Sequence, residues 1–291
     1  MSSELILRPD GSVYHLGLRP EHSTDLVITV GDPDRVPAVS RHFDEVTIRQ
    51  RTREFVTHVG RFAGRPITCI STGIGTDNVD IVLNELDALV NVDLHTGRPS
   101  AQHRQLTFLR LGTSGTFRPE LPVDTLLVST AAIGLDGLGA GYGFAADDFA
   151  DALRLRYPKW AAPAYAARAD GALLRWIGGM GQDIVRGRTL TCAGFYGPQL
   201  RSVRLPHAGP TVRELGEFVG PEADPELQGL HNFEMETAGI YALSTALGHR
   251  ALSLSALLAN RATGTFSETP AATVERMITR TFDLLRAVPL T

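Results

Sequence analysis

The stretch FYGPQLR, from Phe195 to Arg201, places an aromatic ring, an amide and a guanidinium within seven residues. The glycine and the proline between them are typical of a turn or loop. The amide of Gln199 can donate to a carbonyl and accept from an N–H, whereas the guanidinium of Arg201 can only donate. A flat ring with alternating carbonyl and N–H groups would match this pair, with Phe195 packed on its face. The same residue types also occur in loops that bind nothing, so the rest of the chain must decide.

Glycines, hydroxyls and arginines recur directly after four predicted strands. They are GDPDRV with Gly31 and Arg35, STGIGTDN, RLGTSG with Arg110 and Thr113, and Asn260-Arg261. Such a set suits an oxyanion, most simply inorganic phosphate. All but one of the 28 basic residues are arginines, so a phosphate-loop lysine has only Lys159 as a candidate, and no glycine-rich turn precedes it.

Apolar, β-branched runs alternate with helical patterns along the chain. Strands are predicted at 25–30, 65–71, 106–112, 124–133, 184–195 and 250–260, and helices at about 77–91, 170–178, 232–247 and 271–286. This alternation predicts a mostly parallel or mixed sheet covered by helices on both faces. Ligands of such sheets bind at the carboxyl ends of strands.

Two further segments enter the interpretation. The predicted helix at 232–247 opens with HNFEMETAGIY, in which one glutamate is explained by the helix dipole. The carboxylate of the other glutamate could accept hydrogen bonds from a pair of vicinal hydroxyls, with Met235 packed beneath a sugar ring. The stretch GLGAGYG at 137–143 lacks the dinucleotide-binding spacing and is predicted to be a loop.

Composition excludes several classes of protein. The chain has 291 residues, is 43% hydrophobic and 21% charged, and has a net charge of −4, as expected for a globular protein without a nucleic-acid polymer as partner. It has no apolar run of membrane-spanning length, and its first residues do not read as a secretory signal. Cys69 and Cys192 lie in apolar stretches and are predicted to be buried thiols, which favours the cytoplasm.

Together these motifs resemble the uridine phosphorylases of the nucleoside phosphorylase-I family. VYHLGL, GDPDRV, REF, STGIG, RLGTSG, FYGPQLR, EMET and ANR appear in family order along nearly the whole chain. RLGTSG and EMET mark the wider family, and FYGPQLR marks its pyrimidine enzymes. The resemblance implies a single domain over residues 1–291, folded as an α/β/α sandwich with a central mixed sheet. It also implies a hexamer built from dimers and the cleavage of a small-molecule nucleoside by phosphate.

The resemblance also implies a role for each matching residue. Phosphate would be held by Gly31, Arg35, Arg110 and Thr113, with Arg53 supplied by a neighbouring subunit. Ribose would be held by Met235 and Glu236, and the neighbour's His15 would reach its 5′-hydroxyl, with Tyr14 where the family often has Phe. The base would be surrounded by Ser114, Gly115, Phe195, Gln199 and Arg201, with Arg261 close behind. The residues expected to act in catalysis are Arg110, Gln199, Arg201 and Glu236.

Two departures from the family pattern concern a cation site and the base loop. The family's monovalent-cation site at the dimer interface uses a Glu, an Ile carbonyl and a Ser hydroxyl, and these positions match Glu54, Ile74 and Asn78 here. An amide oxygen can also coordinate a hard cation, so Asn78 leaves open both outcomes for the potassium ion that the resemblance implies, binding and no binding. The loop FYGPQLR exchanges the order of the Pro and the Gly, which could shift it without removing its contacts.

The implied reaction is the reversible conversion of uridine and phosphate to uracil and ribose 1-phosphate, with no organic cofactor. Three alternatives stay open. A purine nucleoside phosphorylase of the same family would carry an Asp after a Ser beyond the last strand, where this chain reads LANRATG. A nucleosidase would use water and would not need Arg35, Arg53 and Arg110. A non-catalytic nucleoside-binding protein on this fold would not need the retained site residues.

Overall fold

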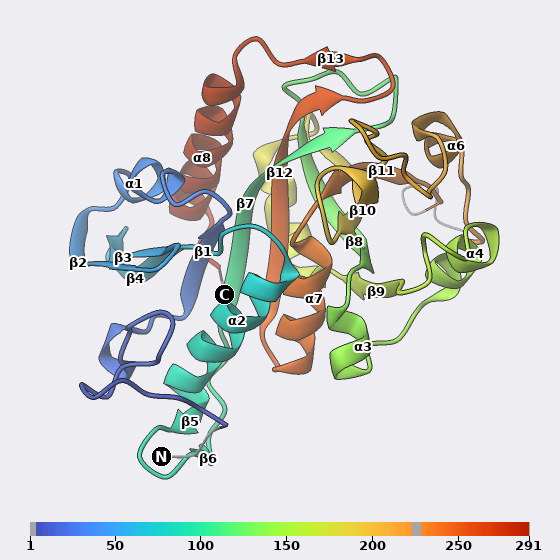
Figure 1. The fold of residues 1–291 in the computed structure, drawn as a ribbon. Helices are drawn as coiled ribbons and strands as arrows, with labels where there is room; N and C mark the ends of the chain where they lie inside the picture. Colours follow the sequence, from blue (N-terminus) through green and yellow to red (C-terminus); the bar gives the residue numbers. More distant parts are fainter. Residues whose placement is uncertain (1–3, 223–227, 291) are drawn as a thin grey trace. The chain divides into compact units, whose positions relative to one another are not determined.

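The computed structural model describes residues 4–222 and 228–290, and the chain divides into two compact units. The first comprises Met1–Arg110 and Leu243–Ala251, and the second Leu111–Ala242 and Leu252–Thr291. The boundary falls within strand β7 (Thr107–Thr116), between Arg110 and Leu111. Each unit therefore has its own strands and helices, which are labelled in Figure 1.

The sheet of the first unit has the strand order β7–β1–β4–β3–β2. β1 (Leu26–Val30) is parallel to both β7 and β4 (Arg65–Ser71). β3 (Phe55–Phe62) and the edge strand β2 (Glu45–Thr52) continue in antiparallel order. β1 is almost wholly buried, whereas exposure alternates along β2, as expected for a central and an edge strand. Because β1 and β4 are parallel, the turns after them meet at one edge.

Helix α2 (Thr76–Asn91) buries the apolar stripe that the sequence predicted, which includes Val79, Val82, Leu83 and Leu86. The other elements of this unit are short. They are η1 (Pro20–His22), α1 (Arg35–Ser40) and the hairpin of β5 (Val92–Asp93) and β6 (Arg98–Pro99).

The sheet of the second unit has the order β13–β12–β8–β10–β11–β7, with β9 (Tyr165–Arg168) paired to β8. Its centre is the parallel pair β8 (Leu126–Leu135) and β10 (Val185–Cys192). β11 (Leu230–Glu234) is parallel to β10 and antiparallel to β7. β12 (Arg250–Asn260) is antiparallel to β8 and to the short β13 (Thr265–Phe266). The sheet is therefore mixed.

The helices of the second unit connect and cover these strands (Figure 1). They are α3 (Leu138–Tyr142), α4 (Asp148–Arg156), α5 (Gly171–Ile177), η2 (Gly178–Met180), η3 (Gly197–Gln199), α6 (Val212–Gly216), α8 (Pro270–Ala287) and most of α7 (Thr237–Ala246). One buried cluster joins strands and helices, with Phe117, Phe149, Leu190 and Phe233 at most 1% exposed. Its aromatic rings give this cluster much of its buried area.

The α/β class with a mixed sheet is confirmed, and the bounds of each predicted strand lie within four residues of an observed one. That residues 1–291 form one domain stays a prediction. Cys69 and Cys192 are buried free thiols as predicted, and burial raises the pKa of both. No described helix combines the length and the hydrophobicity needed to cross a membrane.

Two element predictions are wrong. Residues 230–234 form strand β11 rather than the start of a helix, because they pair with β10 on one side and β7 on the other; α7 begins only at Thr237. The stretch predicted as a loop at 137–143 contains the short helix α3, which ends at Gly143 in the left-handed conformation with φ 70°. Both errors arise where local pattern is overridden by pairing partners or by a glycine cap.

His231 on β11 makes the stability of the fold sensitive to acid. Burial, and then the charge of Arg118, lowers the pKa of His231 to about 4, and its Nδ1 accepts a hydrogen bond from the backbone N–H of Arg188. In the unfolded chain this ring takes up a proton near pH ~6.5, whereas the folded ring stays neutral until about pH 4. Folding is therefore stabilised above the unfolded pKa, and this stability is lost as the pH falls toward the folded pKa.

We expect the free energy of unfolding to fall by about 2 kcal/mol more in the wild type than in His231→Asn between about pH 7 and pH 5. Urea unfolding followed by circular dichroism at the two pH values measures this. The other titrating groups are common to both proteins and cancel in the comparison. Equal losses in the two proteins would contradict the assignment.

Candidate active site

Three residues predicted to bind phosphate lie near the carboxyl end of β1 in the first unit. Gly31 directly follows β1, and a Cβ placed on it would lie 3.4 Å from the carbonyl oxygen of Gly73 in the turn after β4. Arg35 is the first residue of α1, and Arg110 lies on β7, 4% exposed and in register with Thr29 of β1. Near the carboxyl end of β1, the backbone of Gly31 thus lies close to that of Gly73. Arg35 and Arg110 come from the segments that follow and adjoin β1. Thr113, also on β7, belongs to the second unit.

A second group in the first unit contains Tyr14, His15 and Arg53, the last two of which are expected to serve a neighbouring subunit. Arg53 lies in the turn between β2 and β3 with φ 53°, and its Nη2 donates to the Tyr14 hydroxyl over 3.3 Å. Its Cζ lies 5.4 Å from the centroid of the Tyr14 ring, which in turn meets His15 edge-on at 5.0 Å. The structure therefore brings Arg53 close to Tyr14 and His15, which lie 39 and 38 positions before it in the sequence.

The residues predicted to hold a cation also come close together. Around the position that a Cβ on Gly73 would take, Asn78 Nδ2 lies at 2.5 Å and Glu54 Cγ at 3.6 Å. Gly73 has φ 69°, and the absence of a side chain leaves room for both groups. A carboxylate and an amide oxygen are hard donors, which fit an alkali-metal ion. The Ile74 side chain is 71% exposed.

The predicted base loop of the second unit is held by its own side chains. It contains the single turn η3, ending at Leu200 in the left-handed conformation with φ 60°. Arg201 Nη1 donates to the carbonyl oxygen of Phe195 over 2.7 Å and to Gln199 Oε1 over 2.9 Å. Gln199 is 4% exposed. A guanidinium can only donate, so its bond to Oε1 fixes the orientation of the amide. The amide nitrogen, Nε2, is then a donor that this bond does not use.

Arg201 also lies over the Phe195 ring, with Cζ 3.8 Å from its centroid. One face of this ring is therefore covered by the guanidinium, a contact that the sequence did not predict. Burial, and then the charge of Arg261, lowers the pKa of Arg201 to about 10. The side chain remains cationic at neutral pH.

Arg261 supports the loop from behind. Its Nη1 and Nη2 donate to the carbonyl oxygens of Gln199 and Leu200 over 3.0 and 3.1 Å. Its Cγ lies 3.8 Å from the position that a Cβ on Gly115 would take. The neighbouring Ser114 Oγ accepts a hydrogen bond from Asn232 over 3.0 Å. The structure thus places the predicted base residues Ser114, Gly115, Gln199 and Arg201 around Arg261 and β11.

The predicted ribose residues Met235 and Glu236 lie between the end of β11 and the start of α7. Glu236 is buried, at 5% exposure. Glu234, which the sequence did not select as a functional residue, accepts the backbone N–H groups of Glu236 and Thr237, each over 2.9 Å, and the hydroxyl of Thr191. It therefore fixes the backbone that carries Glu236 and caps the first turn of α7.

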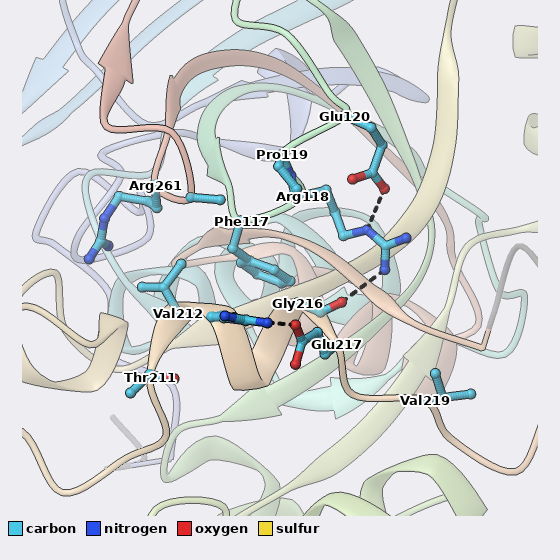
Figure 2. A pocket seen from close by; sticks show the side chains of 12 residues that line it. Phe117, Arg118, Pro119, Glu120, Thr211, Val212, Gly216, Glu217, Val219 and Arg261 are labelled. Carbon is cyan, nitrogen blue, oxygen red and sulfur yellow. Dashed lines mark hydrogen bonds and ion pairs between the residues drawn. The ribbon is translucent and has the colours of Figure 1, made fainter.

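A cavity of about 820 Å³ opens on another part of the second unit (Figure 2). Its wall includes Phe117 and the α6 region, with the ion pairs Arg118–Glu120 at 2.7 Å and Arg213–Glu217 at 2.8 Å. Of the predicted site residues in the described part of the second unit, Arg261 is the one in this wall. The cavity therefore adjoins the base loop through Arg261.

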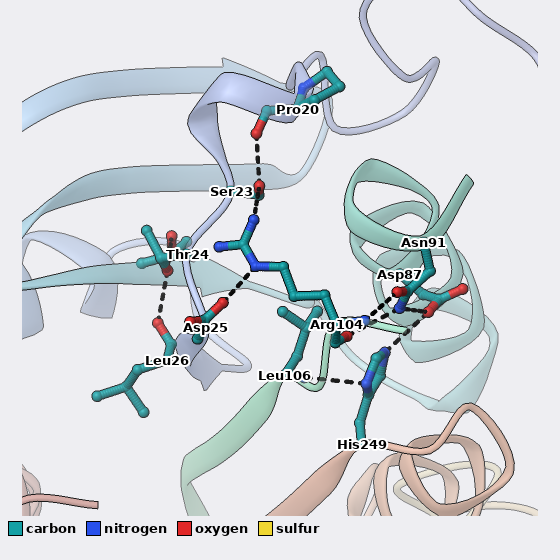
Figure 3. A network of polar contacts seen from close by, with 11 residues as sticks. Pro20, Ser23, Thr24, Asp25, Leu26, Asp87, Asn91, Arg104, Leu106 and His249 are labelled. Carbon is teal, nitrogen blue, oxygen red and sulfur yellow. Dashed lines mark hydrogen bonds and ion pairs between the residues drawn. The ribbon is translucent and has the colours of Figure 1, made fainter. Parts of the chain in front are cut away.

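A polar network in the first unit joins α2 to the start of β12 (Figure 3). Leu106 N–H donates to His249 Nδ1 over 3.2 Å, so Nε2 carries the ring proton and donates to Asp87 over 3.1 Å. Burial raises the pKa of Asp87, but hydrogen bonds from His249 and Asn91 outweigh this and hold it below its ordinary value. His103 lies nearby, stacked on His249 at 5.5 Å. Since Nε2 has no lone pair to offer, this cluster fits a hydrogen-bonded network rather than a metal centre.

Comparison with known proteins shows the family of the chain. Residues 25–288 match the model of the phosphorylase superfamily. The chain is 30% identical over 268 residues to the uridine phosphorylase of Thermococcus kodakarensis, covering 92% of this chain and 84% of that protein. It is 31% identical over 252 residues to the uridine phosphorylase of Escherichia coli, covering 86% of each.

A solved structure extends the likeness to three dimensions. It is a Trypanosoma brucei nucleoside phosphorylase that shows uridine phosphorylase activity; it is 28% identical, with a TM-score of 0.88 over 98% of this chain and all of that one. The fold and the relatives therefore agree, and the chain belongs to the phosphorylase superfamily.

Proposed function

We propose that this chain catalyses the reversible phosphorolysis of uridine, giving uracil and ribose 1-phosphate, as an enzyme of pyrimidine salvage. The observation that carries the proposal is the base loop, in which Arg201 fixes the buried amide of Gln199. The amide Nε2 can donate to a uracil carbonyl, and the second lone pair of Oε1 can accept the ring N3–H. The relatives named uridine phosphorylase support the same substrate.

In the proposed reaction a phosphate oxygen forms a bond to C1′ as the bond from C1′ to the base nitrogen breaks. The electron pair of the broken bond leaves with uracil and spreads over its carbonyl oxygens. Arg201, cationic at neutral pH, stabilises this charge together with the Gln199 amide. Inorganic phosphate is the co-substrate, and no organic cofactor takes part in the scheme.

The remaining roles follow the resemblance and the positions of the residues. Gly31, Arg35, Arg110 and Thr113 would bind phosphate, whose negative charge favours the cationic sugar of the transition state. Glu236 would accept hydrogen bonds from the ribose hydroxyls, with Met235 packed on the sugar. Ser114, Gly115 and Phe195 would border the base. Binding in this orientation supplies much of the rate enhancement through positioning.

Asn260 weighs against the purine alternative. It is 2% exposed, and its Nδ2 donates to the carbonyl oxygens of Arg118 and Leu121 over 3.0 and 2.8 Å. Its Oδ1 accepts the N–H groups of Ala262 and Thr263 over 2.9 and 3.1 Å. Both the nitrogen and the oxygen of this amide are therefore hydrogen-bonded to the backbone, and they support the turn after β12. An amide cannot act as the acid that protonates a purine nitrogen.

The assembly proposed here is a hexamer built from dimers, in which His15 and Arg53 act on the neighbouring subunit's substrates. The proximity of Tyr14, His15 and Arg53 supports a shared role for this group. A potassium ion would be held at the dimer interface by Glu54, the Ile74 carbonyl and Asn78, and would supply only a fixed positive charge there. We further propose that residues 1–291 work as one nucleoside phosphorylase domain in the cytoplasm.

Phosphate dependence tests the reaction class. Uracil release from uridine is expected only when phosphate is present, with ribose 1-phosphate as the sugar product. Arg35 and Arg110 near the carboxyl end of β1 suit the charge of phosphate, and a nucleosidase that uses water would not need them. Chromatography of the sugar products with and without phosphate checks this. Equal uracil release without phosphate, together with free ribose, would show a nucleosidase instead.

A further inference from the structure

The turn that carries His15 is pinned to helix α2 by one buried side chain, Glu85. Glu85 is 7% exposed and comes from the middle of α2, 70 positions along the chain. Its carboxylate accepts the backbone N–H of His15 over 2.9 Å and that of Leu16 over 2.8 Å. Its Oε1 also lies 2.6 Å from Nδ1 of the His15 ring. One carboxylate thus fixes both the backbone and the ring of His15.

These contacts determine where the ring proton sits. The two backbone N–H groups can only donate, so the carboxylate serves as an acceptor for both. At 2.6 Å from the same carboxylate, Nδ1 must carry a proton, because two acceptors would repel each other. In the neutral ring the remaining nitrogen, Nε2, then holds the lone pair. The imidazole side chain is 30% exposed.

We infer that Glu85 is a positioning residue that holds His15 in the Nδ1–H tautomer and thereby presents Nε2 as an acceptor for the 5′-hydroxyl of the nucleoside. The assignment of the tautomer rests on the contacts of Glu85 alone. The assignment of the 5′-hydroxyl rests on the proposed function. Sequence spacing gave no reason to connect Glu85 with His15.

Glu85→Gln changes the tautomer without removing volume. A glutamine offers one carbonyl oxygen to the three donors, and its NH₂ group must face either a backbone N–H or Nδ1. The favourable arrangement turns the NH₂ toward Nδ1 and moves the ring proton to Nε2. His15 would then lose its acceptor, and kcat/KM for uridine is expected to fall roughly fivefold, the net worth of one hydrogen bond. The value for 5′-deoxyuridine is expected to stay unchanged.

The first measurement is the ¹⁵N spectrum of the intact protein labelled in histidine, with the His15 signals assigned by their loss in His15→Gln. The wild type is expected to show a protonated Nδ1 and an unprotonated Nε2, and Glu85→Gln the reverse. The second measurement is the ratio of kcat/KM for uridine to that for 5′-deoxyuridine. This ratio is expected to fall toward one in Glu85→Gln.

Asp87→Asn is the matched control, since Asp87 lies on the same helix and bonds a different histidine, His249. It is expected to leave the His15 signals and the substrate ratio at wild-type values. A wild-type spectrum with the proton on Nε2 overturns the inference, even if Glu85→Gln fails to fold. So does an unchanged ratio in a folded Glu85→Gln. A wild type that does not cleave uridine refutes the proposed function instead, while the spectrum still decides the tautomer.

Discussion

Gln199→Ala is expected to lower kcat/KM for uridine by about 10⁴, because a site built on hydrogen bonds to its substrate loses most when those bonds cannot form. The change removes the Nε2 donor and the Oε1 acceptor together. It also deprives Arg201 of one of its two acceptors, so only the carbonyl oxygen of Phe195 at 2.7 Å still holds the guanidinium by a hydrogen bond. Initial rates with uridine and with inosine, over a range of substrate concentrations, measure the effect.

Gln199→Glu separates the two ends of the amide. The carboxylate keeps the acceptor for Arg201 and nearly the same volume, but it has no donor for a uracil carbonyl. We expect Gln199→Glu to lose most of the kcat/KM for uridine, while its thermal unfolding temperature stays close to that of the wild type. In the unsubstituted enzyme, uridine should be cleaved far faster than inosine. Inosine cleaved as fast as uridine, or a folded Gln199→Ala with full activity, would show that the loop does not read the base.

Mixing two inactive variants is expected to restore activity if Arg53 acts on the neighbouring subunit and Arg110 on its own. Each substitution should lower kcat/KM by about 10² or more, since it removes a positive charge from the transferred phosphate. A mixed dimer then contains one site with both defects and one site with neither. Co-refolding equal amounts should therefore recover about a quarter of the wild-type activity, given random pairing.

The structure refines the choice of variants. Arg53 has φ 53°, so Arg53→Asn avoids the strain that alanine would meet there, and Arg110→Met preserves the volume of a side chain that is 4% exposed. Arg51→Ala, in the exposed part of the same hairpin, is the matched control and should keep full activity. If mass spectrometry confirms mixed oligomers and the mixture stays inactive, both arginines serve the same subunit.

The sequence alone predicted the strands that carry the site. Buried central strands appear in a sequence as continuous apolar runs, and solvent-exposed elements do not have such runs. It could not predict that residues 230–234 form β11, because the apolar and acidic residues there suit the first turn of a helix equally well. Pairing with β10 and β7 decided the matter, and pairing joins residues far apart in the chain.

The same division holds for the site. Residue types and spacing sufficed to select FYGPQLR and the strand-end arginines, because the chemistry of an amide and a guanidinium is local to each side chain. Only the tertiary structure showed that Arg201 covers the Phe195 ring and holds the Gln199 amide, and that Glu85 sets the tautomer of His15. Orientation and protonation depend on which groups packing brings within hydrogen-bond distance, and a sequence lists those groups without placing them.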